Sequence, residues 1–294
     1  VTGAIFEGLV RRYNGEIEPA IAETWDVSND GLTYTFHLRD VAWSDGTPIT
    51  AQDFVDSWNL LIERATPMAQ HTEYFTVDGK ANARAIDEKT LEVTLNYKVP
   101  FIMEVFAMSA MAVVRVDKYD EKGDAYYQTI PETMNGPFLL VDWQPNNVMV
   151  LEPNPDYWNA ERVNFDRVEI YTVTEDTTQV NMYRNGEIDM LDVPETMYKD
   201  FEDEGMIYYE DGANFYIQFT TDGQTDETAK YLANRNFIEA VSACIDREDF
   251  VNSVYNGSFE PTVEFVPGSA TGYNGGTKAD ANVTISSPFM IKAD

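Results

Sequence analysis

Hydrophobic and polar residues alternate strictly over residues 32–39. Leucine, tyrosine, phenylalanine and leucine occupy the even positions, and polar residues occupy the odd ones. A period of two puts the apolar side chains on one face, so the pattern predicts a half-buried antiparallel strand. The turn signal Asn29-Asp30-Gly31 precedes this strand and predicts a hairpin.

The pattern changes to a helical period after residue 50. Thr50 stands at an N-cap position, and Asp53 follows three residues later, where an acid favours the positive end of a helix. Phe54, Trp58 and Leu61 then recur at helical spacing. These residues predict a capped amphipathic helix.

Similar patterns predict elements along most of the remaining sequence. We expect helices at residues 4–10, 100–108, 176–184, 234–244 and 247–255, and strands at residues 86–95, 138–143, 148–152, 168–173, 187–191, 214–220 and 283–285. Strand, helix and strand over residues 168–191 would form a βαβ unit and predict a parallel pair.

The length of 294 residues accommodates roughly two domains. Asp and Glu number 51 against 20 Lys and Arg, which gives a net charge of −31. Such a charge repels nucleic acid and anionic membrane surfaces, so a nucleic-acid partner is excluded. The acidity is consistent with solubility or a salty or acidic habitat, and alternatively with long-range attraction of cationic ligands.

The sequence offers no catalytic or metal motif. His37 and His71 lie far apart and lack metal-ligand spacing, and the one cysteine, Cys244, lies in an apolar run that predicts a buried structural thiol. Nucleotide-binding glycine loops and a Gly-x-Ser-x-Gly elbow are absent from the sequence. We therefore predict no catalytic residue, no metal site and no cofactor.

Two patterns have ordinary explanations. Asp26-x-Ser28-x-Asp30-Gly31 resembles a calcium loop, but its twelfth position is His37 rather than Glu, so a hairpin turn is favoured. No hydrophobic run reaches the length of a membrane-spanning helix, because Glu104 and Ser109 interrupt the longest one.

Several motifs occur in an order that resembles a known family. They are Pro19-x-Ile21-Ala22-Glu23-x-Trp25, Tyr34-x-Phe36-x-Leu38-Arg39, Trp43-Ser44-Asp45-Gly46-Thr47-Pro48, Asn135-Gly136-Pro137-Phe138, Asn154-Pro155-x-Tyr157-Trp158 and Tyr183-Arg184-x-Gly186-Glu187-Ile188-Asp189. This order is similar to that of the extracytoplasmic solute-binding proteins of family 5, the peptide- and nickel-type receptors of ABC importers. The oligopeptide-binding branch is the most similar.

The resemblance implies an α/β fold: a lobe like that of type II periplasmic binding proteins, with an inserted α+β domain and with the second lobe largely missing. It assigns residues 1–16 and 137–260 to the first ligand-binding lobe and residues 17–136 to the inserted domain. Residues 261–294 would be the start of the second lobe or an irregular tail. One wall of a cleft would remain, so we expect this chain alone to bind peptide weakly or not at all.

By the same resemblance, the ligand wall consists of positions at strand ends and one position in the inserted domain. These are Leu191, Asp192, Val193, Phe215, Tyr216 and Met68. Strand ends beside a crossover are common ligand sites, although each residue could equally be part of the core.

The function implied by the resemblance is that of a monomeric substrate-binding receptor, not an enzyme. It would bind oligopeptides or dipeptides and deliver them to ABC permease subunits, in the periplasm or as a cell-surface lipoprotein. Three alternatives stay open: a surface interaction or signalling protein on the same scaffold, a receptor for a glycan or metal chelate, and a hydrolase. With 51 acids, no carboxylate pair stands out as catalytic.

Overall fold

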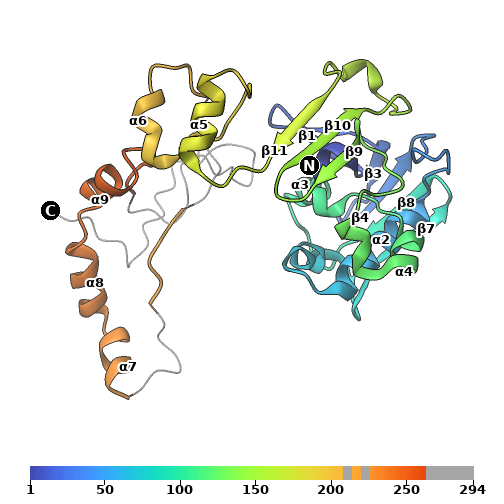
Figure 1. The fold of residues 1–294 in the computed structure, drawn as a ribbon. Helices are drawn as coiled ribbons and strands as arrows, with labels where there is room; N and C mark the ends of the chain where they lie inside the picture. Colours follow the sequence, from blue (N-terminus) through green and yellow to red (C-terminus); the bar gives the residue numbers. More distant parts are fainter. Residues whose placement is uncertain (208–213, 220–225, 263–294) are drawn as a thin grey trace. The chain divides into compact units, whose positions relative to one another are not determined.

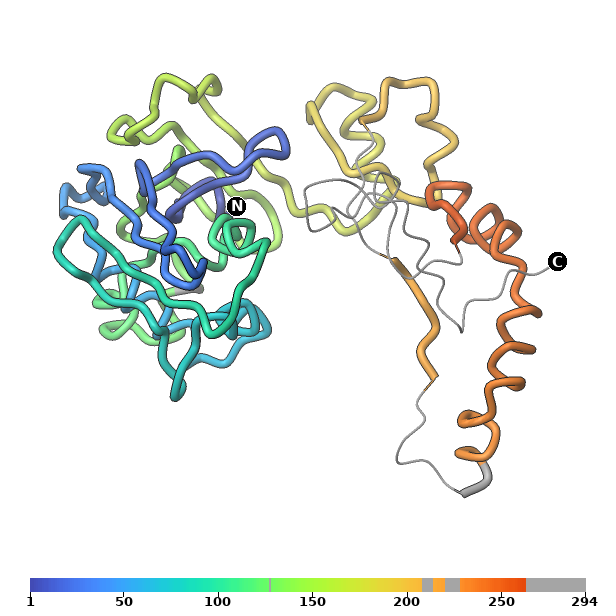
Figure 2. The backbone as a smooth tube through the Cα atoms, turned by 180° about the vertical axis from the view of Figure 1, so that it is seen from behind, coloured from blue at the N-terminus to red at the C-terminus, as the bar shows by residue number. Residues whose placement is uncertain are grey.

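The computed structural model describes residues 1–207, 214–219 and 226–262. The chain divides into two compact units, Val1–Val173 and Thr174–Asp294, and each is considered by itself (Figures 1 and 2). The first unit contains all the strands found among the described residues, while the described part of the second contains helices and irregular segments.

The first unit is built on a four-stranded antiparallel sheet. Its strands, in spatial order, are β3 (Ala22–Val27), β4 (Thr33–Leu38), β8 (Thr90–Thr94) and β7 (Ala83–Asp87). The alternation predicted for β4 is confirmed at its end, where Phe36 and Leu38 are buried and His37 between them is exposed. The turn before β4 is also confirmed, because the Asp30 carboxylate accepts hydrogen bonds from Ser28 and from the Leu32 amide.

Helix α2 (Ala51–Arg64) packs against β7 and β8. Its predicted capping box is confirmed, since the Asp53 carboxylate accepts a hydrogen bond of 2.7 Å from the Thr50 amide and one of 2.8 Å from the Thr50 hydroxyl. An orphan amide at the helix start is thereby satisfied.

Aromatic rings fill the space between the sheet and the helices. Trp58 stacks on Phe106 of α3 (Ile102–Phe106) with centroids 5.7 Å apart, and Phe36 meets Phe106 edge to face at 5.4 Å. The indole N–H of Trp58 donates to the Met111 carbonyl, so the ring is buried with its polar atom paired.

A second antiparallel sheet has the order β11–β10–β9, formed by Val168–Tyr171, Val148–Pro153 and Phe138–Gln144. The predicted hairpin at residues 138–152 is therefore confirmed. At the N-terminus, α1 (Thr2–Ile5) leads into a separate hairpin of β1 (Val10–Tyr13) and β2 (Glu16–Pro19).

Short elements complete the first unit. They are η1 (Pro67–Phe75), β5 (Thr76–Val77), β6 (Lys80–Ala81), η2 (Ser109–Met111), α4 (Val116–Lys122), η3 (Gly123–Gln128) and η4 (Ala160–Arg162).

The second unit contains six described helical segments: α5 (Asp176–Arg184), η5 (Glu195–Met197), α6 (Tyr198–Phe201), α7 (Asp226–Leu232), α8 (Arg235–Ala243) and α9 (Arg247–Val254). The predicted helices at residues 176–184, 234–244 and 247–255 are thus confirmed. Asn234 and Asp246 cap α8 and α9 by accepting hydrogen bonds from Asn236 N–H and Asp249 N–H.

The strand predicted at residues 86–95 is confirmed only over β8 (Thr90–Thr94), its second half. Asp87 accepts a hydrogen bond from the Lys89 amide and turns the chain, so β7 and β8 form a hairpin instead of one strand.

The predicted βαβ unit is wrong, because residues 187–191 do not form a strand. The separate strand predicted at residues 214–220 is also not found over residues 214–219. β11 pairs antiparallel with β10, and the described residues of the second unit offer no strand that residues 187–191 could join. The pieces predicted at residues 220 and 283–285 lie outside the described residues.

A helix at residues 4–10 is a third prediction that fails. The helix ends at Ile5, and the chain then runs extended because its backbone is bonded to a distant segment. Asn135 N–H and Gly136 N–H both donate to the Ile5 carbonyl, and Glu7 N–H donates to the Asn135 side chain. Tertiary hydrogen bonds here override local helix propensity.

The Glu7 side chain is buried at the same junction. Its carboxylate accepts a 2.6 Å hydrogen bond from the Tyr157 hydroxyl and another from the Trp158 indole N–H, and Arg11 Nη1 lies 3.6 Å away. The guanidinium of Arg39 covers the Trp158 ring at 4.1 Å. Burial nevertheless raises the pKa of Glu7 above its ordinary value, although Tyr157, Trp158, Arg11 and Arg39 all favour the charged form.

Gly136 has no room for a side chain. An added Cβ would lie 2.6 Å from the Ile5 carbonyl carbon and 2.7 Å from the Ala4 oxygen, both backbone atoms. We predict that Gly136→Ala lowers the free energy of unfolding by about 3 kcal/mol, measured by urea denaturation. Gly3→Ala is the matched control, because its Cβ meets nothing within 4 Å and the change should stay within about 0.5 kcal/mol. Equal stability of the two variants would contradict the prediction.

A second prediction concerns pH. Because the pKa of Glu7 is raised in the folded state, its contribution to stability is present below the ordinary pKa and is lost as pH rises through the folded value. Glu7→Gln cannot titrate, so the difference in unfolding free energy, variant minus wild type, should become more positive from about pH 4 to about pH 8. Urea denaturation at several pH values measures this difference, and a pH-independent difference would refute the assignment.

Candidate functional site

Five of the six predicted wall residues lie in the second unit. Leu191 and Val193 are half-buried and Asp192 is exposed, all in an irregular segment between α5 and η5. Phe215 and Tyr216 are exposed by 79% and 57% in the irregular segment 214–219, and the Phe215 ring meets Phe259 edge to face at 5.6 Å. These are accessible side chains, so the alternative that they form a packed core does not hold for Asp192, Phe215 and Tyr216.

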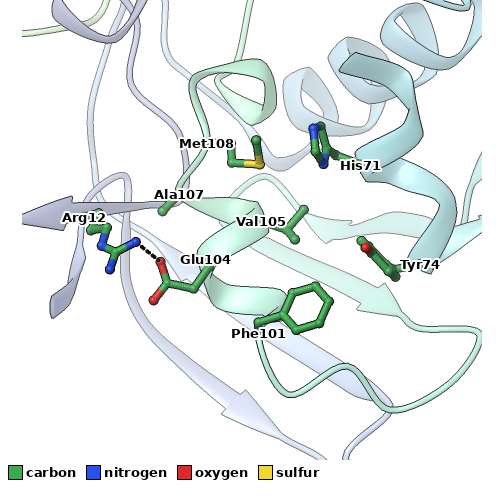
Figure 3. Close-up of a pocket in the computed structure, with 8 residues that line it drawn as sticks. All are labelled: Arg12, His71, Tyr74, Phe101, Glu104, Val105, Ala107 and Met108. Carbon is green, nitrogen blue, oxygen red and sulfur yellow. Dashed lines mark ion pairs between the residues drawn. The ribbon is translucent and has the colours of Figure 1, made fainter. Parts of the chain in front are cut away.

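Met68, the sixth residue, lies in the first unit near the start of η1 and is 45% exposed. The same short helix carries residues that border a hollow in this unit. The hollow has a volume of about 440 Å³ and is called the η1–α3 groove below (Figure 3).

Three segments form the η1–α3 groove. β1 contributes Arg12, and η1 contributes His71 and Tyr74. The remaining lining residues lie in or beside α3: Phe101, Glu104, Val105, Ala107 and Met108. Arg12 and Glu104 form an ion pair of 3.4 Å that lies on the other side of Val105 from His71 and Tyr74 (Figure 3). Apolar surface bordered by a few polar groups is typical of ligand pockets.

Aromatic rings define one wall of the groove. Tyr74 meets Phe101 edge to face at 5.6 Å and Tyr97 at 6.2 Å. Burial raises the pKa of Tyr74, with Glu73 and Tyr97 adding to the shift, so its hydroxyl stays protonated and can donate a hydrogen bond.

This groove is scarcely predictable from the sequence. Phe101 and Met108 fall in the apolar run beginning at Val99, which resembles any other core segment, and half of the Phe101 side chain is nevertheless exposed. Arg12 reaches the groove from 59 residues before His71 in the chain, so only the tertiary fold brings these residues together.

The second hollow, of about 270 Å³, is lined by Trp43, Arg115 and several acids. These charges are already engaged in structural contacts: Arg115 pairs with Asp45 and Asp117, and Asp53 caps α2. Arg115 lowers the pKa of Asp117, while hydrogen bonds from Thr47, followed by Arg115, lower the pKa of Asp45, in both cases despite partial desolvation. We therefore assign this hollow a structural role.

Among the described residues there is neither a metal-binding cluster nor a membrane-spanning helix. No three His, Cys, Asp or Glu side chains there are grouped so as to hold a metal ion. Within the same residues, none of the helices is long and apolar enough to cross a membrane.

The comparisons with known proteins agree on one class. Residues 16–286 match the family described as bacterial extracellular solute-binding proteins, family 5. The periplasmic oligopeptide-binding protein OppA of Salmonella typhimurium is 32% identical over 285 residues, which cover 91% of this chain and 52% of that protein. The dipeptide-binding protein DppE of Bacillus subtilis is 30% identical over 305 residues, covering 98% of this chain and 55% of its own length.

A solved structure shows the same fold. Listeria monocytogenes OppA bound to peptide superposes with a TM-score of 0.75 at 25% identity, over 92% of this chain and 56% of that one. This chain belongs to the family 5 solute-binding proteins, and it spans about half the length of these relatives. The predicted family and fold class, an OppA-type periplasmic binding protein fold present in part, are confirmed.

Cys244 departs from its prediction. It lies at the C-cap of α8 and is exposed, not buried, because the buried side of this helix is formed by Ser242. We predict that the native protein reacts with Ellman's reagent at one thiol without denaturant, since a thiol in contact with water can ionise and attack. Cys244→Ser should abolish the reaction. A thiol that reacts only after denaturation would contradict the described position.

Proposed function

We propose that this chain is part of the substrate-binding receptor of an ABC importer and that the receptor binds oligopeptides outside the cytoplasmic membrane. The observation that carries the proposal is the match of residues 16–286 to the family of extracellular solute-binding proteins. Relatives that bind oligopeptides and dipeptides, each aligned over at least nine-tenths of this chain, support peptide as the ligand class.

Recognition of a peptide would follow from the backbone. Extended peptides bind through main-chain hydrogen bonds, while side-chain pockets add selectivity. We propose that Leu191, Asp192, Val193, Phe215, Tyr216 and Met68 form one wall of the binding cleft. The exposure of Met68, Phe215 and Tyr216 supports this assignment, since a wall must be reachable by ligand.

The proposed receptor is a monomer that works without catalysis and meets its permease subunits at the membrane, either free in the periplasm or as a lipoprotein. Membership in a family of solute-binding proteins supports the absence of catalysis. The division into domains remains a prediction: a first lobe of residues 1–16 and 137–260, an inserted domain of residues 17–136, and residues 261–294 as the start of the second lobe or an irregular tail.

Isothermal titration of the full-length gene product with peptides of two to six residues tests the ligand class. We expect saturable binding with 1:1 stoichiometry. A glycan or metal chelate that binds while every peptide fails would replace peptide as the ligand. If peptides bind but deletion of the gene leaves peptide uptake intact and abolishes a cell-surface response, a signalling role would replace transport.

We predict that Phe215→Ala weakens peptide binding about tenfold, because exposed aromatic side chains that become buried by a ligand dominate binding energy. Phe165→Ala is the matched control, since Phe165 is also largely exposed but lies in the first unit, outside the proposed wall. Equal affinities of Phe215→Ala and wild type in the same titration would remove Phe215 from the wall.

A further inference from the structure

We propose that the η1–α3 groove is a side-chain subsite that receives an uncharged aromatic side chain of a bound peptide. The proposal rests on the proposed function for the peptide itself, and it adds a location and a chemical preference that the predicted wall does not contain.

The shape of the groove suits one large side chain. Val105 lines the groove and is itself only 4% exposed. Ala107 and Met108 add further apolar atoms to the lining. The volume of about 440 Å³ lies within the range of about 300–1,000 Å³ that is typical of small-ligand pockets. A side chain that entered would displace water from apolar surface, which favours binding.

The rings of the groove favour an aromatic occupant. Tyr74 and Phe101 meet at an interplanar angle of 87°, and Phe101 remains 51% exposed, so its free surface can contact a further ring. Aromatic pairs gain binding free energy beyond that from the burial of area. The flexible thioether of Met108 adapts to an inserted ring and adds a sulfur–aromatic contact.

The charges of the groove favour an uncharged side chain. Arg12 and Glu104 lie 3.4 Å apart and neutralise each other, so neither is left to recruit a counter-ion. An anionic side chain would also meet the field of a chain with net charge −31.

Two polar groups are available to orient the peptide. In the part of the chain that the structure describes, neither the His71 ring nor the Tyr74 hydroxyl makes a hydrogen bond within the protein, and both border the groove. Each can bond a peptide main-chain group while the aromatic side chain contacts Phe101 and Val105.

One member of the predicted wall lies on the same short helix as two residues of the groove. Met68 precedes His71 by three residues in η1 and is 45% exposed. The proposal places a peptide that contacts Met68 beside η1, with a neighbouring side chain in the groove.

A phenylalanine scan of tetra-alanine, titrated against the full-length gene product, tests the subsite. We expect phenylalanine at one position to strengthen binding at least about fivefold over tetra-alanine. Phe101→Ala should reduce this preference to below about twofold, because the ring contact that favours phenylalanine is removed. Phe165→Ala, the control, should keep the preference.

The outcomes separate the subsite from the proposed function. If peptides bind but the phenylalanine preference survives Phe101→Ala and also survives Ala107→Trp, which adds a large ring at a half-buried lining position, the subsite is elsewhere and the receptor function stands. If Phe101→Ala weakens tetra-alanine and phenylalanine peptides equally, the subsite is again refuted. If no peptide binds the wild type, the proposed function fails together with the subsite. Circular dichroism of each variant confirms that it is folded.

Discussion

A buried carboxylate at Glu7 fixes the N-terminal segment of the first unit. Tyr157 and Trp158 donate to it from 150 and 151 residues further along the chain, and Arg11 lies beside it. Burial of a charge is costly unless it is paired, so this carboxylate constrains both segments at once. The neighbouring backbone is equally constrained, because residues 4–6 pass so close to Gly136 that no Cβ fits.

This junction joins the start of the first unit's sequence to segments that lie more than a hundred residues later. The β1–β2 hairpin, the turn before β9 and the aromatic turn after β10 are joined through Glu7, Asn135 and Tyr157. The four-stranded sheet next to it has a different kind of core, in which Trp58, Phe36 and Phe106 pack ring against ring. The rigid aromatic core supports α3 from one side and leaves its other side to the η1–α3 groove.

Local patterns in the sequence predicted local elements well. The cap of α2 at Thr50 and Asp53 and the hairpin at residues 138–152 depend on contacts within a few residues, which a sequence displays directly. The motif order also predicted the family correctly. Two failures share one cause: residues 4–10 and 187–191 depend on distant partners, and a period of two or of 3.6 says nothing about whether a partner strand is present. The miss at residues 86–89 is local, because Asp87 accepts a hydrogen bond from the Lys89 amide and turns the chain.

The sequence by itself determined the family, the fold class, the cap of α2 and the turns, because these follow from residue order and short-range hydrogen bonds. Only the tertiary structure decided that Glu7 is buried, that Cys244 is exposed and that Arg12, His71 and Phe101 share a groove. Burial and proximity are properties of packing between segments tens to more than a hundred residues apart, so no local pattern contains them.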